Sequence, residues 1–343
     1  MGADQVIAPP RPAAIMARRA RASATRTHTT LHLLYKETML QVLLSGLSIG
    51  AIYGLVAMAF AVVFYVTRVI NFATGQLLMI AIMLTAGLAK AGVPVGFAIV
   101  IGILASTVGG VLIYFLAVRP VLRFDRFSFA WLVSTLGVAI VLQSAAAIIY
   151  GPTSRTFPAL LNRQSIRIGN ASITWQEALA IIVAVVAVVA FEVFRRRTLF
   201  GKVGMAISSD PEMASAIGAR VTAYAVAAFA IGGLLAGVAG VLIGPITYAN
   251  PYLGDTYGIT GFVALMIGGI ERPAAAMGGG LVLGVLSVGA NAFIGSQASD
   301  WFPFVVVVVV LLIAPHGLFA SGDAVRKLVA GIGRRRATVG ANS

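Results

Sequence analysis

Long apolar runs follow one another along almost the whole chain, separated by short polar segments. An α-helix needs about 20 apolar residues to cross the hydrocarbon layer of a membrane. Runs of roughly this length lie at 40–66, 76–92, 95–118, 130–150, 176–194, 221–247, 274–293 and 302–320. A further run, 258–270, is too short to cross alone and predicts a half-helix. The pattern therefore predicts an all-α polytopic membrane protein with about 8–9 transmembrane helices.

The stretch "YVTRVINFATGQLLMI" at 65–80 places a polar knot between two of these runs. Its polar and flexible residues are Arg68, Asn71, Thr74, Gly75 and Gln76. Irregular backbone at membrane depth is tolerated only where it is buried in protein or lines a water-filled cavity, so we predict a broken helix near 68–76. Two roles stay open for these side chains. They can satisfy the backbone groups that the break sets free, or they can offer hydrogen bonds to a passing solute.

Charge is scarce, and its position is informative. Of the 343 residues 59% are hydrophobic and only 10% charged, although the formal net charge is +14. Lys and Arg cluster between or beyond the apolar runs, as in cytoplasmic loops under the positive-inside rule. They do not form a stripe interleaved with base-stacking aromatic residues, which argues against nucleic-acid binding. The rule places 119–126, 195–220 and the C-terminal tail inside, and 151–175 and 248–257 outside.

Both ends of the chain lack long apolar runs. Residues 1–38 are polar, Arg-rich and without hydrophobic periodicity, so we predict a disordered basic N-terminal tail. Met39 stands directly before the first span, and a translation start there would leave the tail untranslated. If 258–270 crosses the membrane, this tail lies outside, against the positive-inside rule; a re-entrant segment is the alternative. The transmembrane domain then covers 39–320, and 321–343 form a basic cytoplasmic C-terminal tail.

The side chains that usually carry chemistry are missing from the spans. There is no cysteine, and the carboxylates Glu177, Glu192, Asp255, Glu271 and Asp300 all fall at segment ends or in loops. Ion-coupled carriers usually expose carboxylates or histidines within the membrane. The sequence also has no phosphate-binding loop and no Ser-His-Asp or metal-ligand constellation. A membrane enzyme and an ion-coupled carrier therefore both lack their machinery, and active transport would need an energy source outside this chain.

The inward loop "RRRTLFGKVGMAISSDPEMASAIGARVTAY" at 195–224 predicts a short surface helix. Ser209 and Glu212 have the spacing of a capping box, and Pro211 fits the first helical turn. Gly218 is expected to end the helix. A solvated loop helix is the plain interpretation; its small apolar residues favour a docking function.

Glycines four residues apart predict close helix packing in lipid rather than ligand sites. They are Gly46, Gly50 and Gly54; Gly233 and Gly237; Gly240 and Gly244; and Gly280 and Gly284.

Several separated stretches resemble the LivH-type membrane subunit of bacterial branched-chain amino acid ABC transporters. They are "GLSIGAIYGLVAMAFAVVFYVTRVINFATGQLLMI", "GMAISSDPEMASAIGARV", "FAIGGLLAGVAGVLIGP" and "GGIERPAAAMGGGLVLG", and the resemblance runs from about residue 39 to about 320. It implies a permease of the cell inner membrane without a cofactor of its own. Its implied partners are a second, related permease, two cytoplasmic ATPase subunits that bind ATP, and a periplasmic or lipid-anchored solute-binding protein.

The resemblance also implies roles for the two polar segments. Residues 209–218 become the coupling helix that docks on an ATPase, with Ser209, Asp210, Glu212, Ala216 and Gly218 as the candidate residues. The translocation pathway is assigned to the break, with Asn71, Thr74, Gly75 and Gln76.

The sequence departs from the family pattern at informative places. Thr74 and Gln76 stand where the family usually has His and Glu, Met205 replaces a common Arg, and "GGIERP" replaces Gly-Gly-Ile-Gly-Ser. With no fixed charge expected inside the spans, a neutral solute with an apolar side chain fits best, so we predict transport of branched-chain or other neutral amino acids. A permease for urea or short amides is the alternative, ahead of an ion-coupled secondary carrier.

Overall fold

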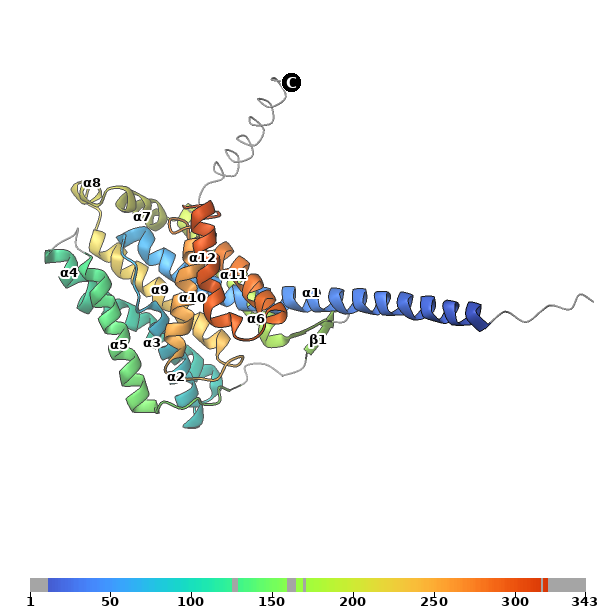
Figure 1. Ribbon diagram of the computed structural model, residues 1–343. Helices are drawn as coiled ribbons and strands as arrows, with labels where there is room; N and C mark the ends of the chain where they lie inside the picture. Colours follow the sequence, from blue (N-terminus) through green and yellow to red (C-terminus); the bar gives the residue numbers. More distant parts are fainter. Residues whose placement is uncertain (1–11, 125–128, 159–164, 169–170, 316, 320–343) are drawn as a thin grey trace, which may run out of the picture.

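The computed structural model describes residues 12–124, 129–158, 165–168, 171–315 and 317–319, and it is a bundle of helices (Figure 1). The first half of the chain forms α1 (Pro12–Thr67), α2 (Thr74–Lys90), α3 (Val95–Ile113), the π-helical turn η1 (Tyr114–Val118), α4 (Arg119–Phe124) and α5 (Ala130–Tyr150). The second half forms α6 (Trp175–Arg197), α7 (Leu199–Ser209), α8 (Pro211–Ala216), α9 (Val221–Ile243), α10 (Leu253–Gly268), α11 (Pro273–Phe293) and α12 (Ala298–Ile313). The predicted all-α class is confirmed.

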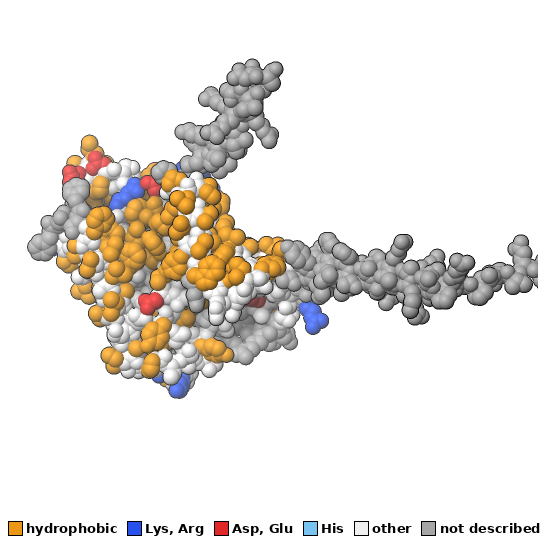
Figure 2. Space-filling model, in the orientation of Figure 1, with side chains coloured by type: hydrophobic (Ala, Val, Ile, Leu, Met, Phe, Trp, Pro, Cys, Tyr) orange, Lys and Arg blue, Asp and Glu red, His pale blue; other side chains and the backbone are white. Residues whose placement is uncertain are grey.

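Within the described residues six helices are long and apolar enough to cross a membrane, and three shorter apolar helices accompany them. The short ones are α2, α10 and the apolar part of α12. Figure 2 shows hydrophobic side chains over the middle of the bundle, with most charged side chains toward its ends. Because an exposed apolar belt is stable only in lipid or against another protein, the chain is a multi-pass membrane protein.

A short β-hairpin, which the apolar pattern did not predict, precedes α6. Strands β1 (Ser165–Ile168) and β2 (Ala171–Thr174) pair antiparallel, with Ser165 opposite Thr174. Thr174 then caps α6, since its side chain accepts from the Glu177 N–H while the Glu177 side chain accepts from the Thr174 N–H. Alternation over only four residues is too short to distinguish such strands from a loop.

The glycine spacing predicted close packing, and the helix pair α1–α11 confirms it. Gly50 and Gly54 of α1 face Gly280 and Gly284 of α11, so that the backbones of the two helices touch. Gly233 and Gly237 of α9 similarly pack on Ser106 of α3. Gly244 differs, because it follows α9 and lies against the ring of Phe157 in a loop.

The positions of basic side chains define two ends of the bundle. One end, called here the basic end, holds α4, α7, α8 and the α10–α11 loop (Figure 1). Its described cations are Arg68, Arg119, Arg123, Arg195, Arg196, Arg197, Lys202, Arg220 and Arg272. From Met39 onward, the opposite end holds the hairpin and the described cations Lys90, Arg155 and Arg167. By the positive-inside rule the basic end is cytoplasmic.

The open question about 258–270 is answered by α10. Helix α9 ends at the outer side, where the backbones of Arg155 and Ala249 form a β-bridge. Helix α11 begins at the basic end, where Glu271 forms a salt bridge with Arg68. The chain therefore returns through α10 to the cytoplasmic side. Consequently α1 enters from the outer end, where Gln41 bonds to Ser172 of the hairpin.

The start of α1 differs from the prediction. Disorder was expected over 1–38, but the helix begins at Pro12 and runs without a break into the first span; residues 1–11 lie outside the described residues. Once a helix is nucleated, each added residue costs little, and Ala, Arg and Leu favour the helical state. The predicted C-terminal tail 321–343 lies outside the described residues.

Replacing Gly284 with Ala should destabilise the α1–α11 contact, because the added Cβ would collide with the Cα of Gly50. We expect a loss of about 1–3 kcal/mol in the free energy of unfolding, seen as a lower melting temperature of the purified protein in detergent. Gly289→Ala is the matched control on the same helix, since its Cβ would meet only Val42 Cγ1 at 3.7 Å. Equal melting temperatures of the two variants would contradict close backbone packing between α1 and α11.

Candidate functional site: a mid-depth break and a cytoplasmic helix pair

The predicted broken helix is present between α1 and α2. Helix α1 ends at Thr67, six residues follow in non-helical conformation, and α2 begins at Thr74. Asn71, 1% exposed, holds the turn, because its Oδ1 accepts from the Ala73 N–H at 3.1 Å and its carbonyl accepts from the Thr74 N–H and hydroxyl at 3.0 and 2.7 Å. These contacts satisfy backbone groups that water cannot reach. Asn71 and Thr74 thus stabilise the break itself.

The break carries the chain back to the middle of the membrane. Gly75, in the first turn of α2, packs directly on the backbone of Gly254 and Gly258 in α10. The ring of Tyr257, one residue before Gly258, lies against the ring of Tyr53 with 5.9 Å between the ring centroids, and Tyr53 is the midpoint of the span Met39–Thr67. At 1.5 Å per residue this level is about 21 Å from the cytoplasmic end of α1. The N-termini of α2 and α10 therefore meet near mid-depth.

Asp255 completes this meeting point, and its position corrects the sequence analysis. It was expected in an outer loop, but it lies in the first turn of α10. Gln76 Nε2 of α2 donates to Asp255 Oδ1 at 2.7 Å, and Gln143 Nε2 of α5 donates to Oδ2. The prediction of spans without fixed charge is therefore wrong at this point. The apolar run starting at 258 concealed the fact that α10 begins five residues earlier.

The predicted surface helix is present as α8, with a different cap. Asp210, not Ser209, is the N-cap: its Oδ1 accepts from the N–H groups of Glu212 and Met213 at 3.0 and 2.9 Å. Ser209 ends α7 and donates to the Met205 carbonyl. The capping box predicted for Ser209 and Glu212 is thus wrong. Pro211 carried the signal for Asp210, because a proline at the first helical position favours the extended cap conformation for the residue before it.

Gly218 ends α8 as predicted. It adopts φ +93°, Gly218 N–H donates to Ser215, and Ala219 N–H donates to Ala214, which is the Schellman pattern. Ala216 and the large side chains of Met213 and Ile217 are exposed on the cytoplasmic side. The helix is therefore capped at both ends and shows an apolar surface.

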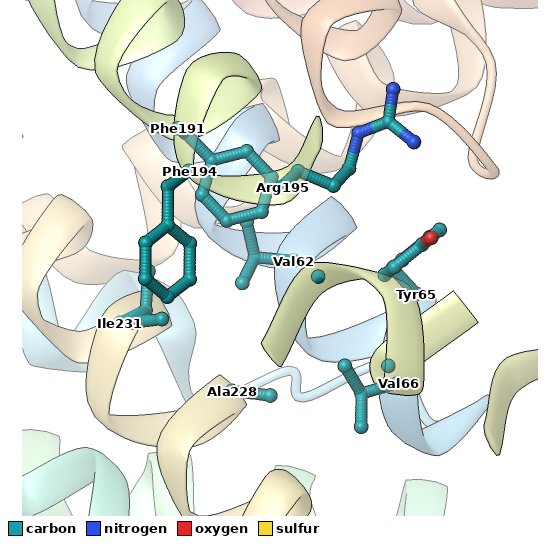
Figure 3. A pocket seen from close by; sticks show the side chains of 10 residues that line it. Val62, Tyr65, Val66, Phe191, Phe194, Arg195, Ala228 and Ile231 are labelled. Carbon is teal, nitrogen blue, oxygen red and sulfur yellow. The ribbon is translucent and has the colours of Figure 1, made fainter. Parts of the chain in front are cut away.

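The pair α7–α8 rests on the cytoplasmic ends of the spans. Ile207 and Ala214 are buried against Val66 of α1 and Ala228 of α9. Beside this cluster a small apolar pocket separates α7 from α1, α6 and α9 (Figure 3). Its lining residues are Val62, Tyr65, Val66, Phe191, Phe194, Arg195, Gly201, Gly204, Ala228 and Ile231. The volume of about 20 Å³ has room for a water molecule but not for an amino acid.

Arg68 connects α7–α8 to the break, a role that sequence reasoning missed. Its Nε and Nη2 donate to the carbonyl of Ser208 at 3.2 Å, and Nη1 lies 3.4 Å from Glu271 Oε1 in the α10–α11 loop. It adopts φ +56°, a conformation that costs free energy for a residue with a side chain. The unusual Glu271 in "GGIERP" was the available signal for a partner.

Comparisons with known proteins identify the family. The family described as "Branched-chain amino acid transport system / permease component" matches residues 42–314. The chain belongs to this family. The LivH permease protein of the high-affinity branched-chain amino acid transport system of Escherichia coli K12 is 32% identical to this permease over 299 residues, covering 83% of this chain and 96% of that protein.

Further relatives carry corresponding names. BraD of Pseudomonas aeruginosa, also a high-affinity branched-chain amino acid transport system permease protein, is 32% identical over 301 residues, covering 83% of this permease and 96% of BraD. A probable LivH of Methanocaldococcus jannaschii is 24% identical over 285 residues, covering 77% and 87% of the two chains.

Replacing Arg68 with Ala should loosen α7–α8 in this permease. The variant keeps the strained backbone but loses the donors to Ser208 and the contact with Glu271. A loss of about 1–2 kcal/mol predicts amide hydrogen exchange of residues 199–218 that is about 5- to 30-fold faster. Lys202→Ala removes an exposed cation of α7 and serves as the control. If amide hydrogen exchange of residues 199–218 is as slow in Arg68→Ala as in Lys202→Ala, Arg68 does not hold α7–α8 in place.

Proposed function

We propose that this chain is one permease subunit of an ABC importer in a bacterial inner membrane, and that it forms part of the pathway for branched-chain amino acids. The family match over residues 42–314 carries this proposal. The full-length relatives are named for branched-chain amino acid transport. A urea or amide permease is the less favoured reading.

The importer needs partners for ATP hydrolysis, since the sequence contains no phosphate-binding loop motif. We infer two cytoplasmic ATPase subunits, a second related permease, and a periplasmic or lipid-anchored solute-binding protein. In this arrangement α8 is the coupling helix, and Met213 and Ile217 fill a groove of an ATPase subunit. Exposed apolar side chains on a helix that is capped at both ends support this role, because a rigid helix can transmit displacement.

Within the pathway we assign different roles to the four residues of the break. The side chains of Asn71 and Thr74 bond to the break's own backbone, which supports a structural role. Gly75 permits the close approach of α2 to α10. Gln76 alone reaches a polar group of another helix, so it is the residue of this set that stands nearest to the solute.

Coupling is tested by Gly218→Val in the complex reconstituted with its partners. A β-branched residue resists φ +93°, so α8 should lose its C-terminal stop. The backbone strain in this variant is ~1–2 kcal/mol or greater. We therefore expect leucine uptake to fall about tenfold or more, while basal ATP hydrolysis persists. Gly218→Asn, which tolerates this conformation, should remain close to wild type. Normal uptake by Gly218→Val would reject the coupling role.

The substrate is tested by uptake of labelled leucine into proteoliposomes that contain the wild-type complex and its binding protein. Isoleucine and valine should compete, whereas glutamate and lysine should not, because each brings a side-chain charge in addition to those of its zwitterion and the meeting point of α2 and α10 offers only the carboxylate of Asp255 among the described residues. Competition by urea, with leucine itself inert, would refute the substrate and leave the permease assignment intact.

A further inference from the structure

We propose that Asp255 receives the ammonium group of the amino acid at the middle of the pathway; this inference rests on the proposed function. The carboxylate, together with the amides of Gln76 and Gln143, joins three helices at one polar point, α10, α2 and α5. Of these three residues only Gln76 was predicted from the sequence as a pathway residue, because Gln143 and Asp255 lie 67 and 179 residues farther along the chain.

The position of Asp255 is unusual for a carboxylate. It lies two residues from Tyr257, which is level with the midpoint of the α1 span, yet the Asp255 residue is exposed on the surface of the bundle. A carboxylate at this depth is costly in lipid, and such residues face a protein interior or a water-filled cavity. The side of the bundle formed by α5 and α10 therefore faces the aqueous pathway between this chain and the second permease.

The Asp255 carboxylate is surrounded by amide donors and the start of a helix. Each carboxylate oxygen accepts an N–H from a neutral amide, and the first turn of α10 places partial positive charge beside it. Within the described part of the chain, no Lys, Arg or His forms an ion pair with Asp255. The site thus combines a carboxylate, held by two amide donors, with no paired cation among the described residues.

Gln76 supplies the second, independent sign of a ligand. Its residue is 1% exposed, and its Oε1 has no hydrogen-bond partner among the described residues. An unsatisfied buried acceptor costs free energy, and this one lies next to Gly254, beside the carboxylate. An ammonium group has three N–H donors and would bind Asp255 first. It would then reach Gln76 Oε1 if that side chain shifts during transport.

A purely structural role, in which Asp255 only ties three helices together, explains less. A neutral Asn or Gln could accept the same amide hydrogens without placing a charge at this depth. The carboxylate is matched by a zwitterion, because the ammonium group neutralises it during passage. Free carboxylates and uncharged amides lack that group, so the site selects for a primary amine within the broad class of small apolar solutes.

The first test compares Asp255→Asn with Thr256→Val in the reconstituted complex at saturating leucine-loaded binding protein. Loss of a hydrogen bond to a charged group predicts leucine uptake lowered about tenfold or more in Asp255→Asn, with unchanged assembly and basal ATP hydrolysis. Thr256→Val, in the same helical turn, should stay within about twofold of wild type. Wild-type uptake by Asp255→Asn overturns the site, whereas failure of the wild-type complex to transport leucine refutes the proposed function instead.

The second test separates charge from packing and keeps the proposal testable if Asp255→Asn assembles poorly. The chain has no cysteine, so Asp255→Cys carries a unique thiol. Treatment with an anionic methanethiosulfonate should restore uptake, while a cationic or neutral reagent of similar size should not. Leucine-loaded binding protein should slow the labelling. Equal rescue by the neutral reagent, or no labelling from water, overturns the proposal.

Discussion

The structure depends on how the backbone between α1 and α2 is satisfied inside the membrane. An unpaired N–H or C=O in hydrocarbon costs several kcal/mol, so a break at this depth needs a complete set of internal partners. Asn71 provides the central ones, with its side chain on Ala73 and its carbonyl on Thr74. Phe72 closes the segment by packing on Phe262 of α10 at 5.3 Å. This turn allows α2 to start at mid-depth.

The start of α2 at mid-depth would have little effect without a second helix that starts at the same level. Gly75 and Gly258 allow the backbones of α2 and α10 to touch. The glycines of α1 and α11 bring those two neighbouring helices equally close. Two discontinuous helices that meet near the bilayer centre are a recurrent architecture of transport sites. Here the meeting point also holds the carboxylate of Asp255 between the amides of Gln76 and Gln143.

The cytoplasmic end links this meeting point to α8 by a short series of contacts. Asp210 and Gly218 define α8, Ala214 anchors it on the spans, and Arg68 connects the end of α7 to the start of the break. Packed side chains and hydrogen bonds of this kind move together rather than deform continuously. If α8 docks on an ATPase as proposed, its displacement would therefore reach Arg68, immediately before the segment that leads to Gln76.

The sequence by itself determined the helical class, the break near 68–76, the glycine seam and the stop at Gly218. Each of these is a local property: apolar length, a cluster of polar residues, a spacing of four, or a residue that tolerates positive φ. The local proline at position 211 also encoded the Asp210 cap, although the capping-box spacing pointed to Ser209. The hairpin was too short for its alternation to be read.

Only the tertiary structure decided which polar groups meet and at what depth. Gln76, Gln143 and Asp255 come together from three helices, and Arg68 reaches Ser208 and Glu271 across 140 and 203 residues. Apolar length cannot place Asp255, because the depth of a helix start depends on which neighbour it packs against. In this protein that neighbour is α1, whose Tyr53 contacts Tyr257 at the middle of the span.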